Sequence, residues 1–66
     1  MNLQFNGRAC QTTATTLAEL LREQGYEPTS KVATAVNGQF VAKHSRDEHT
    51  LSEGDQIEVV APMQGG

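Results

Sequence analysis

The last two residues of the chain, Gly65 and Gly66, carry its most distinctive chemical possibility. A carboxylate becomes an acyl donor only after its oxygen is made a good leaving group, for example by adenylation with ATP. Because glycine has no Cβ and accepts either sign of φ, a Gly-Gly end can enter a narrow active site where other residues would clash. Domain ends are also often small and frayed without any function. The pattern favours a functional end over a merely frayed one, and we expect another protein to activate the carboxylate of Gly66.

Residues 62–66 follow a β-rich segment directly, and we expect them to form a flexible, extended tail. Such a segment reaches about 17 Å when fully extended. Ordering it costs about 5–10 kcal/mol at 1–2 kcal/mol per residue. Pro62 reduces this cost slightly because its ring fixes φ. A docking surface on the domain must therefore supply compensating affinity for the partner.

A metal site is the next candidate, because His44 and His49 lie five residues apart with Asp47 and Glu48 between them. Imidazole and carboxylate both suit zinc. The spacing lacks the cysteines or the matching second ligand pair of a structural zinc site. We interpret the segment as a solvated loop and expect no metal.

The sequence offers no convergent set of catalytic groups. It contains neither GxGxxG nor GxxxxGK[ST], the glycine-rich patterns that cradle phosphates. The carboxylates have ready structural roles in a helix cap, a helix face, a turn and a strand face: Glu19, Glu23, Glu53, Asp55 and Glu58. We therefore expect no catalytic residues, no intrinsic cofactor and no enzyme activity of the isolated chain.

Cys10 is the single cysteine, so it has no partner for an internal disulfide. This fits a reducing compartment. Arg8 is the only cation close to it in sequence, and we interpret Cys10 as a small packing residue rather than a reactive thiol. Whether it forms a covalent link to a partner stays open.

Charge and length exclude several classes of function. The net charge is −3, and the nearest approach to a basic cluster, Lys43 and Arg46, is followed at once by Asp47 and Glu48. A surface that follows phosphates needs a concentrated basic stripe, so we expect no nucleic-acid partner. No apolar run approaches the ~20 residues of a membrane span, and no signal peptide is recognisable. We expect no membrane partner and a cytoplasmic location.

The elements that must position the tail begin with a hairpin. Met1, Leu3 and Phe5 alternate with polar residues and share one face of a half-buried strand. Asn6-Gly7 is a strong hairpin signal, so the following residues, 8–12, return antiparallel.

A helix follows at Thr16-Leu17-Ala18-Glu19, which matches the capping box. In that motif Thr16 accepts a hydrogen bond from the Glu19 amide, and Glu19 reaches back to the Thr16 amide. Leucines at 17, 20 and 21 form the apolar stripe, while Glu19, Arg22 and Glu23 face water. Gly25 suits the left-handed position after the helix, which brings Tyr26 toward Leu21.

The second half of the chain predicts a turn at 27–30, strands at 31–36 and 39–42 joined by Asn37-Gly38, a polar surface connection at 43–50, a turn at 53–55 and a last strand at 56–61. In that last strand Glu58 must face water, so Ile57 and Val59 face the core. Val60 then lies on the opposite face, where it becomes a candidate docking residue.

The order of hairpin, helix, hairpin and final strand predicts an α+β fold. One helix with a three-leucine stripe can cover one face of a four- or five-stranded mixed sheet. The opposite face is then polar, or it is a docking surface for another protein. We expect one domain over residues 1–66.

Several segments together resemble the ThiS family of ubiquitin-like sulfur carriers in thiamin thiazole biosynthesis. They are Asn6-Gly7, Thr16 to Leu21, Ala35-Val36-Asn37-Gly38, and Leu51 to Val60 with the Gly65-Gly66 ending. The resemblance covers essentially the whole chain and implies the ubiquitin-like β-grasp fold.

The resemblance also implies a mechanism and partners. An adenylyltransferase related to ubiquitin-activating enzymes would use ATP to adenylate Gly66. A persulfide sulfur donor would convert it to a thiocarboxylate, and thiazole synthase would receive the sulfur. By the same resemblance, Gly65 threads the partner active sites, while Met63 and Gln64 contact the channel mouth.

Two other functions are compatible with the same ending. The small subunit of molybdopterin synthase is similar in fold and chemistry but usually longer, so the short chain favours the thiazole branch. A ubiquitin-like modifier would use the same activated Gly66 with a lysine amine as nucleophile.

Overall fold

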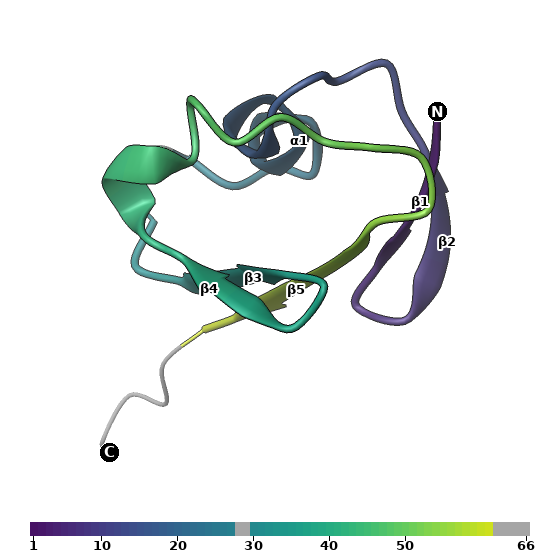
Figure 1. Ribbon diagram of the computed structural model, residues 1–66. Coiled ribbons are helices and arrows are strands. Elements are labelled where there is room, and N and C mark those ends of the chain that lie inside the picture. Colours follow the sequence, from purple (N-terminus) through teal and green to yellow (C-terminus); the bar gives the residue numbers. More distant parts are fainter. Residues whose placement is uncertain (28–29, 62–66) are drawn as a thin grey trace.

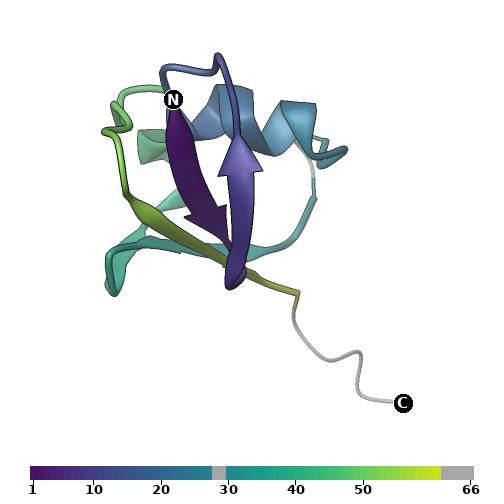
Figure 2. The ribbon, with the colours of Figure 1, turned by 90° about the vertical axis from the view of Figure 1, so that its right-hand side faces the viewer.

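A mixed sheet in the order β2-β1-β5-β3-β4 forms the framework of the computed structural model, which describes residues 1–27 and 30–61. Within these residues the elements are β1 (Asn2–Phe5), β2 (Arg8–Gln11), α1 (Leu17–Glu23), β3 (Ala33–Val36), β4 (Gln39–Val41), the 3₁₀ turn η1 (Lys43–Ser45) and β5 (Gln56–Val60). Helix α1 lies across one face of the sheet (Figure 1). The view turned by 90° shows the β1–β2 hairpin beside this helix and β5 crossing beneath it (Figure 2).

Both predicted hairpins are confirmed. Asn6 and Gly7 have φ values of 51° and 80°, and Asn37 and Gly38 have 53° and 81°. Two successive positive φ values define the type I′ turn, whose twist matches that of the antiparallel strands on either side. Asparagine and glycine are the residues that accept this conformation most easily, so the turn sequence sets the register of each hairpin.

The last strand, β5, holds the two hairpins together. It runs parallel to β1, where Phe5 lies opposite Ile57, and antiparallel to β3, where Thr34 lies opposite Val59. A parallel pair needs a long crossover connection, which here contains α1 and the second hairpin. This arrangement confirms the predicted α+β, ubiquitin-like β-grasp fold with a mixed sheet and one main helix. The predicted tail, 62–66, lies outside the described residues.

The start of α1 confirms one half of the capping box and corrects the other. The Thr16 hydroxyl accepts from the Glu19 amide at 3.2 Å, as predicted. The Glu19 carboxylate does not take its hydrogen bonds from the Thr16 amide; it accepts from the Thr15 amide at 2.8 Å and the Thr15 hydroxyl at 3.0 Å. Thr15 offers two donors where Thr16 would offer one. Both hydrogen bonds from Thr15 lower the pKa of the Glu19 carboxyl, and the bond from the backbone amide has the larger effect.

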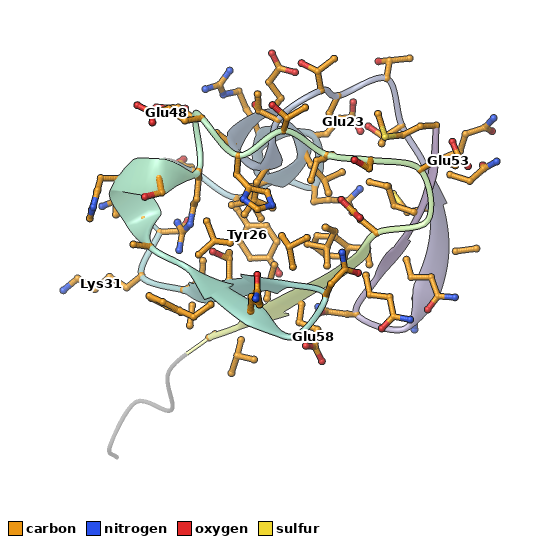
Figure 3. The ribbon with its side chains drawn as sticks, viewed as in Figure 1. Glu23, Tyr26, Lys31, Glu48, Glu53 and Glu58 are labelled. Carbon is orange, nitrogen blue, oxygen red and sulfur yellow. The ribbon has the colours of Figure 1, made fainter. Side chains whose placement is uncertain are left out.

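The end of α1 is the predicted Schellman motif. The Gly25 amide donates to the Arg22 carbonyl at 3.1 Å, and the Tyr26 amide donates to the Leu21 carbonyl at 2.9 Å. Gly25 has φ 94°, the left-handed conformation that the motif requires. The chain turn places Tyr26 between helix and sheet (Figure 3), with its ring centroid 6.4 Å from that of Phe5.

The core fills the space between α1 and the inner face of the sheet. Leu17, Leu20 and Ile57 are almost completely buried, as the helical stripe and the alternation in β5 predicted. The other buried apolar residues are Leu3, Ala14, Leu21, Val36, Val41, Leu51 and Val59. Glu19, Arg22 and Glu23 are exposed, as predicted.

The segment 43–50 was predicted to be a polar surface connection, and this is wrong at Arg46, which is only 7% exposed. Its Nε donates to the Thr34 hydroxyl at 3.0 Å and its Nη2 donates to the Val32 carbonyl at 2.6 Å. The Thr34 hydroxyl in turn donates to the Val41 carbonyl at 2.8 Å. A buried charge is tolerated when such partners satisfy it, so Arg46 fastens the connection to the sheet.

Candidate docking face

The face of the sheet that points away from α1 has no cover among the described residues (Figures 1 and 2). Strand β5 alternates between the two faces. Ile57 is 1% exposed and Val59 is 8% exposed on the inner face, while Glu58 is exposed and Val60 is 63% exposed on the outer face. The predicted orientation of Val60 is therefore confirmed. Its role in docking stays a prediction.

Phe40 is the outer-face residue that sequence reasoning missed. It is 71% exposed, more than either Met1 or Val60, the other exposed large apolar residues of the described chain. A signal was available in the sequence. Val41 is apolar and belongs in the core, so its neighbour Phe40 must point to the opposite face of the same strand.

The pairing register brings Phe40 and Val60 to the same face on either side of β3. Phe40 lies opposite Ala35, and Val60 lies opposite Ala33. The strand between them, β3, carries the small residues Ala33 and Ala35 on this face. The two larger side chains therefore project further from the sheet than the alanines do, which leaves a depression between them. Together they border a hollow of about 450 Å³. We call this the Phe40–Val60 hollow; its described lining residues are Ser30, Lys31, Val32, Ala33, Phe40, Lys43, Arg46 and Val60.

The hollow lies where β5 ends. Val60 is both the last residue of β5 and part of the lining, and the next residue, Ala61, is exposed. The chain therefore leaves the sheet beside the apolar surface. The four tail residues predicted to act in partner active sites, Met63, Gln64, Gly65 and Gly66, lie outside the described residues.

The other candidate groups occupy structural positions. Glu53 accepts from the Asn2 amide at 3.0 Å, and Asp55 accepts from the Asn37 side chain at 2.9 Å and from the Ser52 amide at 2.8 Å. These contacts close the turn before β5 and tie it to β1 and to the turn between β3 and β4. They agree with the structural roles that the sequence predicted for these carboxylates.

Cys10 packs against the core, half-buried in β2, and accepts a hydrogen bond from the Gln24 amide group at 3.5 Å. This agrees with its interpretation as a packing residue. His44 is exposed and His49 half-buried. In the stretches 1–27 and 30–61, no group of three or more His, Cys, Asp or Glu side chains could hold a metal ion.

A family model of the ThiS family matches residues 3–66 of the chain, that is, nearly all of it. The chain belongs to the ThiS family. The match includes the sheet from Leu3 onward, the helix and the positions up to Gly66. A search of curated proteins finds no match.

Two solved structures agree with this membership. The crystal structure of the thiamine biosynthesis protein ThiS from Geobacter metallireducens is 28% identical, with a TM-score of 0.84 and complete coverage of both chains. A solution NMR structure of a thiamine biosynthesis protein from the same organism is also 28% identical, with a TM-score of 0.78, covering 100% of this chain and 88% of the other.

Membership of the ThiS family supports a sulfur-carrier role in thiamine biosynthesis. It is consistent with a protein that is not an enzyme, and it implies activating and synthase partners. In the described part of the chain, no helix is long and apolar enough to cross a membrane.

Proposed function

We propose that this chain carries sulfur on the carboxyl group of Gly66 and delivers it to thiazole formation in thiamin biosynthesis. A partner adenylyltransferase, related to ubiquitin-activating enzymes, adenylates Gly66 with ATP. A persulfide donor then supplies sulfur to the activated carbonyl. Thiazole synthase accepts the sulfur from the resulting thiocarboxylate and leaves Gly66 as a carboxylate again.

The observation that carries this proposal is the family match that continues through Gly66, together with full coverage of both chains in the likeness to a ThiS crystal structure. A carrier whose reactive group lies on its last residue requires that the likeness reach that residue. Here it does so with the whole β-grasp framework before it.

The chemistry needs no group from the carrier other than its carboxylate. Attack of a Gly66 oxygen on the α-phosphate of ATP releases pyrophosphate and leaves an acyl-adenylate. The terminal sulfur of the persulfide attacks the acyl carbon and displaces AMP. A thiol then cleaves the S–S bond of this acyl disulfide, which gives the thiocarboxylate and a disulfide. ATP is bound by the partner, so this chain needs no intrinsic cofactor and no catalytic residue in this scheme.

The domain has two tasks in this scheme, to dock and to present the tail. Val60 and Phe40 provide apolar docking area at the point where β5 ends. Gly65 passes through the narrowest part of the partner active site, because a residue without Cβ occupies the least space there. Met63 and Gln64 contact the channel mouth. Because ATP and persulfide donors are available in the cytoplasm, we place the carrier there.

The test removes Gly66 or converts the C-terminal carboxylate to an amide. Either change should abolish sulfur loading in a reaction with ATP, a persulfide donor and the activating enzyme, since no carboxylate remains at the correct distance from the domain. The described core ends at Val59, so circular dichroism and the urea midpoint should be unchanged.

A Cys10→Ser variant is the matched control, and it should retain full sulfur loading because Cys10 packs against the core on β2. Normal sulfur loading of the shortened or amidated chain would show that Gly66 is not the carrier residue. Loss of loading in Cys10→Ser alone would move the chemistry to that thiol.

A further inference from the structure

The Phe40–Val60 hollow has a positively charged rim in a protein whose net charge is −3. Lys31, Lys43 and Arg46 line it, and no acidic residue is among its described lining residues. Figure 3 shows Lys31 projecting from the end of the sheet at which β5 finishes. The described lining is therefore positively charged although the molecule as a whole is acidic. Glu58 lies opposite Ala35 on the same outer face but is not among the lining residues.

Two of these three cations are available to a partner. The Arg46 guanidinium is buried and donates to Thr34 and to the Val32 carbonyl. Lys31 and Lys43 are exposed. A lysine ammonium is a compact point charge on a flexible stem, so each can adjust to a carboxylate that a partner places near it.

The interior of the hollow is apolar. Ala33 forms the floor, and Phe40 and Val60 stand on either side of it. A volume of about 450 Å³ is large enough to receive an apolar side chain with part of its backbone. Shape and charge together define what fits: an apolar group in the middle with negative charge around it.

We propose that the Phe40–Val60 hollow receives an apolar side chain of the activating adenylyltransferase, flanked by carboxylates that pair with Lys31 and Lys43. This rests on the proposed function and adds the chemistry of the docking partner. Net repulsion between an acidic carrier and an acidic site is overcome locally, because screening confines electrostatic interactions to about 8 Å at physiological salt. The rim lysines then set the register of the tail relative to the active site of the partner.

Charges on the rim of an interface act mainly on the association rate and on its salt dependence. Binding of the unchanged carrier should therefore weaken as salt is raised. Replacing both lysines by glutamate places like charges opposite each other, so binding should weaken and its salt dependence should change sign.

The experiment measures the Kd for the purified adenylyltransferase that loads this chain, at several salt concentrations. The double variant Lys31→Glu/Lys43→Glu should raise Kd at least about tenfold at low salt, and added salt should then tighten binding. The control, Arg8→Glu/Arg22→Glu, makes the same change in net charge at two exposed residues that do not line the hollow. It should change Kd by less than about threefold.

An equal loss in both double variants, or no loss in the lysine variant, would overturn the proposal. Tighter binding by the lysine variant would show that the partner site is basic and would also overturn it. A second copy of this chain is the other possible occupant, and sedimentation equilibrium tests for it. If the unchanged chain is a dimer and the lysine variant is a monomer, the hollow holds a second copy and the proposal is wrong. Sulfur loading of the unchanged chain is recorded in parallel. If loading fails there, the proposed function is wrong, whereas normal loading with insensitive binding rejects only the charged rim.

Discussion

The two faces of the sheet are built from the same strands and have opposite properties. On the inner face of β5, Ile57 and Val59 are buried against α1. On the outer face of the same strand, Glu58 and Val60 are exposed, and Phe40 lies on the same face on β4, with β3 between the two strands. The period-two alternation of a strand is sufficient to produce this difference.

The difference separates stability from function along a single strand. Apolar area removed from water on the inner face stabilises the fold, at roughly 25 cal/mol per Å². Apolar area left in water on the outer face contributes nothing to that core and is available for association. A small domain that must dock can therefore keep an exposed phenylalanine as long as the other face holds the structure.

Ile57→Ala tests the inner face and should have the largest effect. Ile57 is 1% exposed, and truncation of a buried isoleucine costs about 2–5 kcal/mol through lost transfer energy and the cavity left behind. The free energy of unfolding from urea titration should fall by that amount. Val60→Ala, in the same strand but 63% exposed, should change it by no more than about 0.5 kcal/mol. Similar losses in the two variants would remove the distinction between the faces.

Phe40→Ala tests the outer face, where we expect binding to weaken and stability to stay the same. Aromatic residues at the centre of an interface commonly account for about 2 kcal/mol of binding, so Kd for the activating enzyme should rise about thirtyfold. The free energy of unfolding of the Phe40→Ala variant should be unchanged within about 0.5 kcal/mol, because the Phe40 side chain is 71% exposed. Binding is measured by calorimetry and stability by urea titration. Unimpaired binding would mean that the partner uses another surface.

Arg46→Met asks how the connection after β4 is held against the sheet. The change leaves the Val32 carbonyl without its donor and removes the bond to Thr34, at a cost of about 1–3 kcal/mol. Hydrogen exchange should rise first in segment 43–50. Arg22→Met, at an exposed helix position, should cost less than about 0.5 kcal/mol. A silent Arg46 variant would show that apolar packing alone places this connection.

Glu19→Gln should have the smallest effect, and that effect depends on pH. Hydrogen bonds from Thr15 lower the folded-state pKa of Glu19 below its ordinary value of 4.5. The charged form therefore stabilises the fold above that pH, and the contribution is lost as the pH falls through the folded-state pKa. Wild type should be more stable than the variant at pH 7 and indistinguishable from it in strong acid. A stability difference that is constant with pH would contradict the assignment.

Sequence patterns were sufficient where local geometry decides the structure. Asn-Gly predicted both hairpins because positive φ at two successive residues is a local requirement. The start and end of α1 followed from Thr16 and Gly25 for the same reason. The burial of Ile57 and the exposure of Val60 followed from alternation about Glu58.

Positions that depend on tertiary contacts were missed. Arg46 lies in a polar segment, and arginines are rarely buried, so no sequence pattern indicates its contact with the Val32 carbonyl. Alternation with the buried Val41 places Phe40 on the outer face, but that pattern does not say which residues lie near it there. The pairing of β3 with β4 and β5 is needed to place Phe40 on the same face as Val60, across β3.

The central claim, that sulfur is carried on Gly66, is tested most directly by mass spectrometry of the C-terminal peptide. The protein is analysed after incubation with ATP, a persulfide donor and its activating enzyme. Fragmentation must localise the change to Gly66, because oxidation of methionine or of Cys10 adds nearly the same mass. Replacement of one oxygen of Gly66 by sulfur is the predicted result. A plain carboxylate at Gly66 after this incubation would contradict the carrier account.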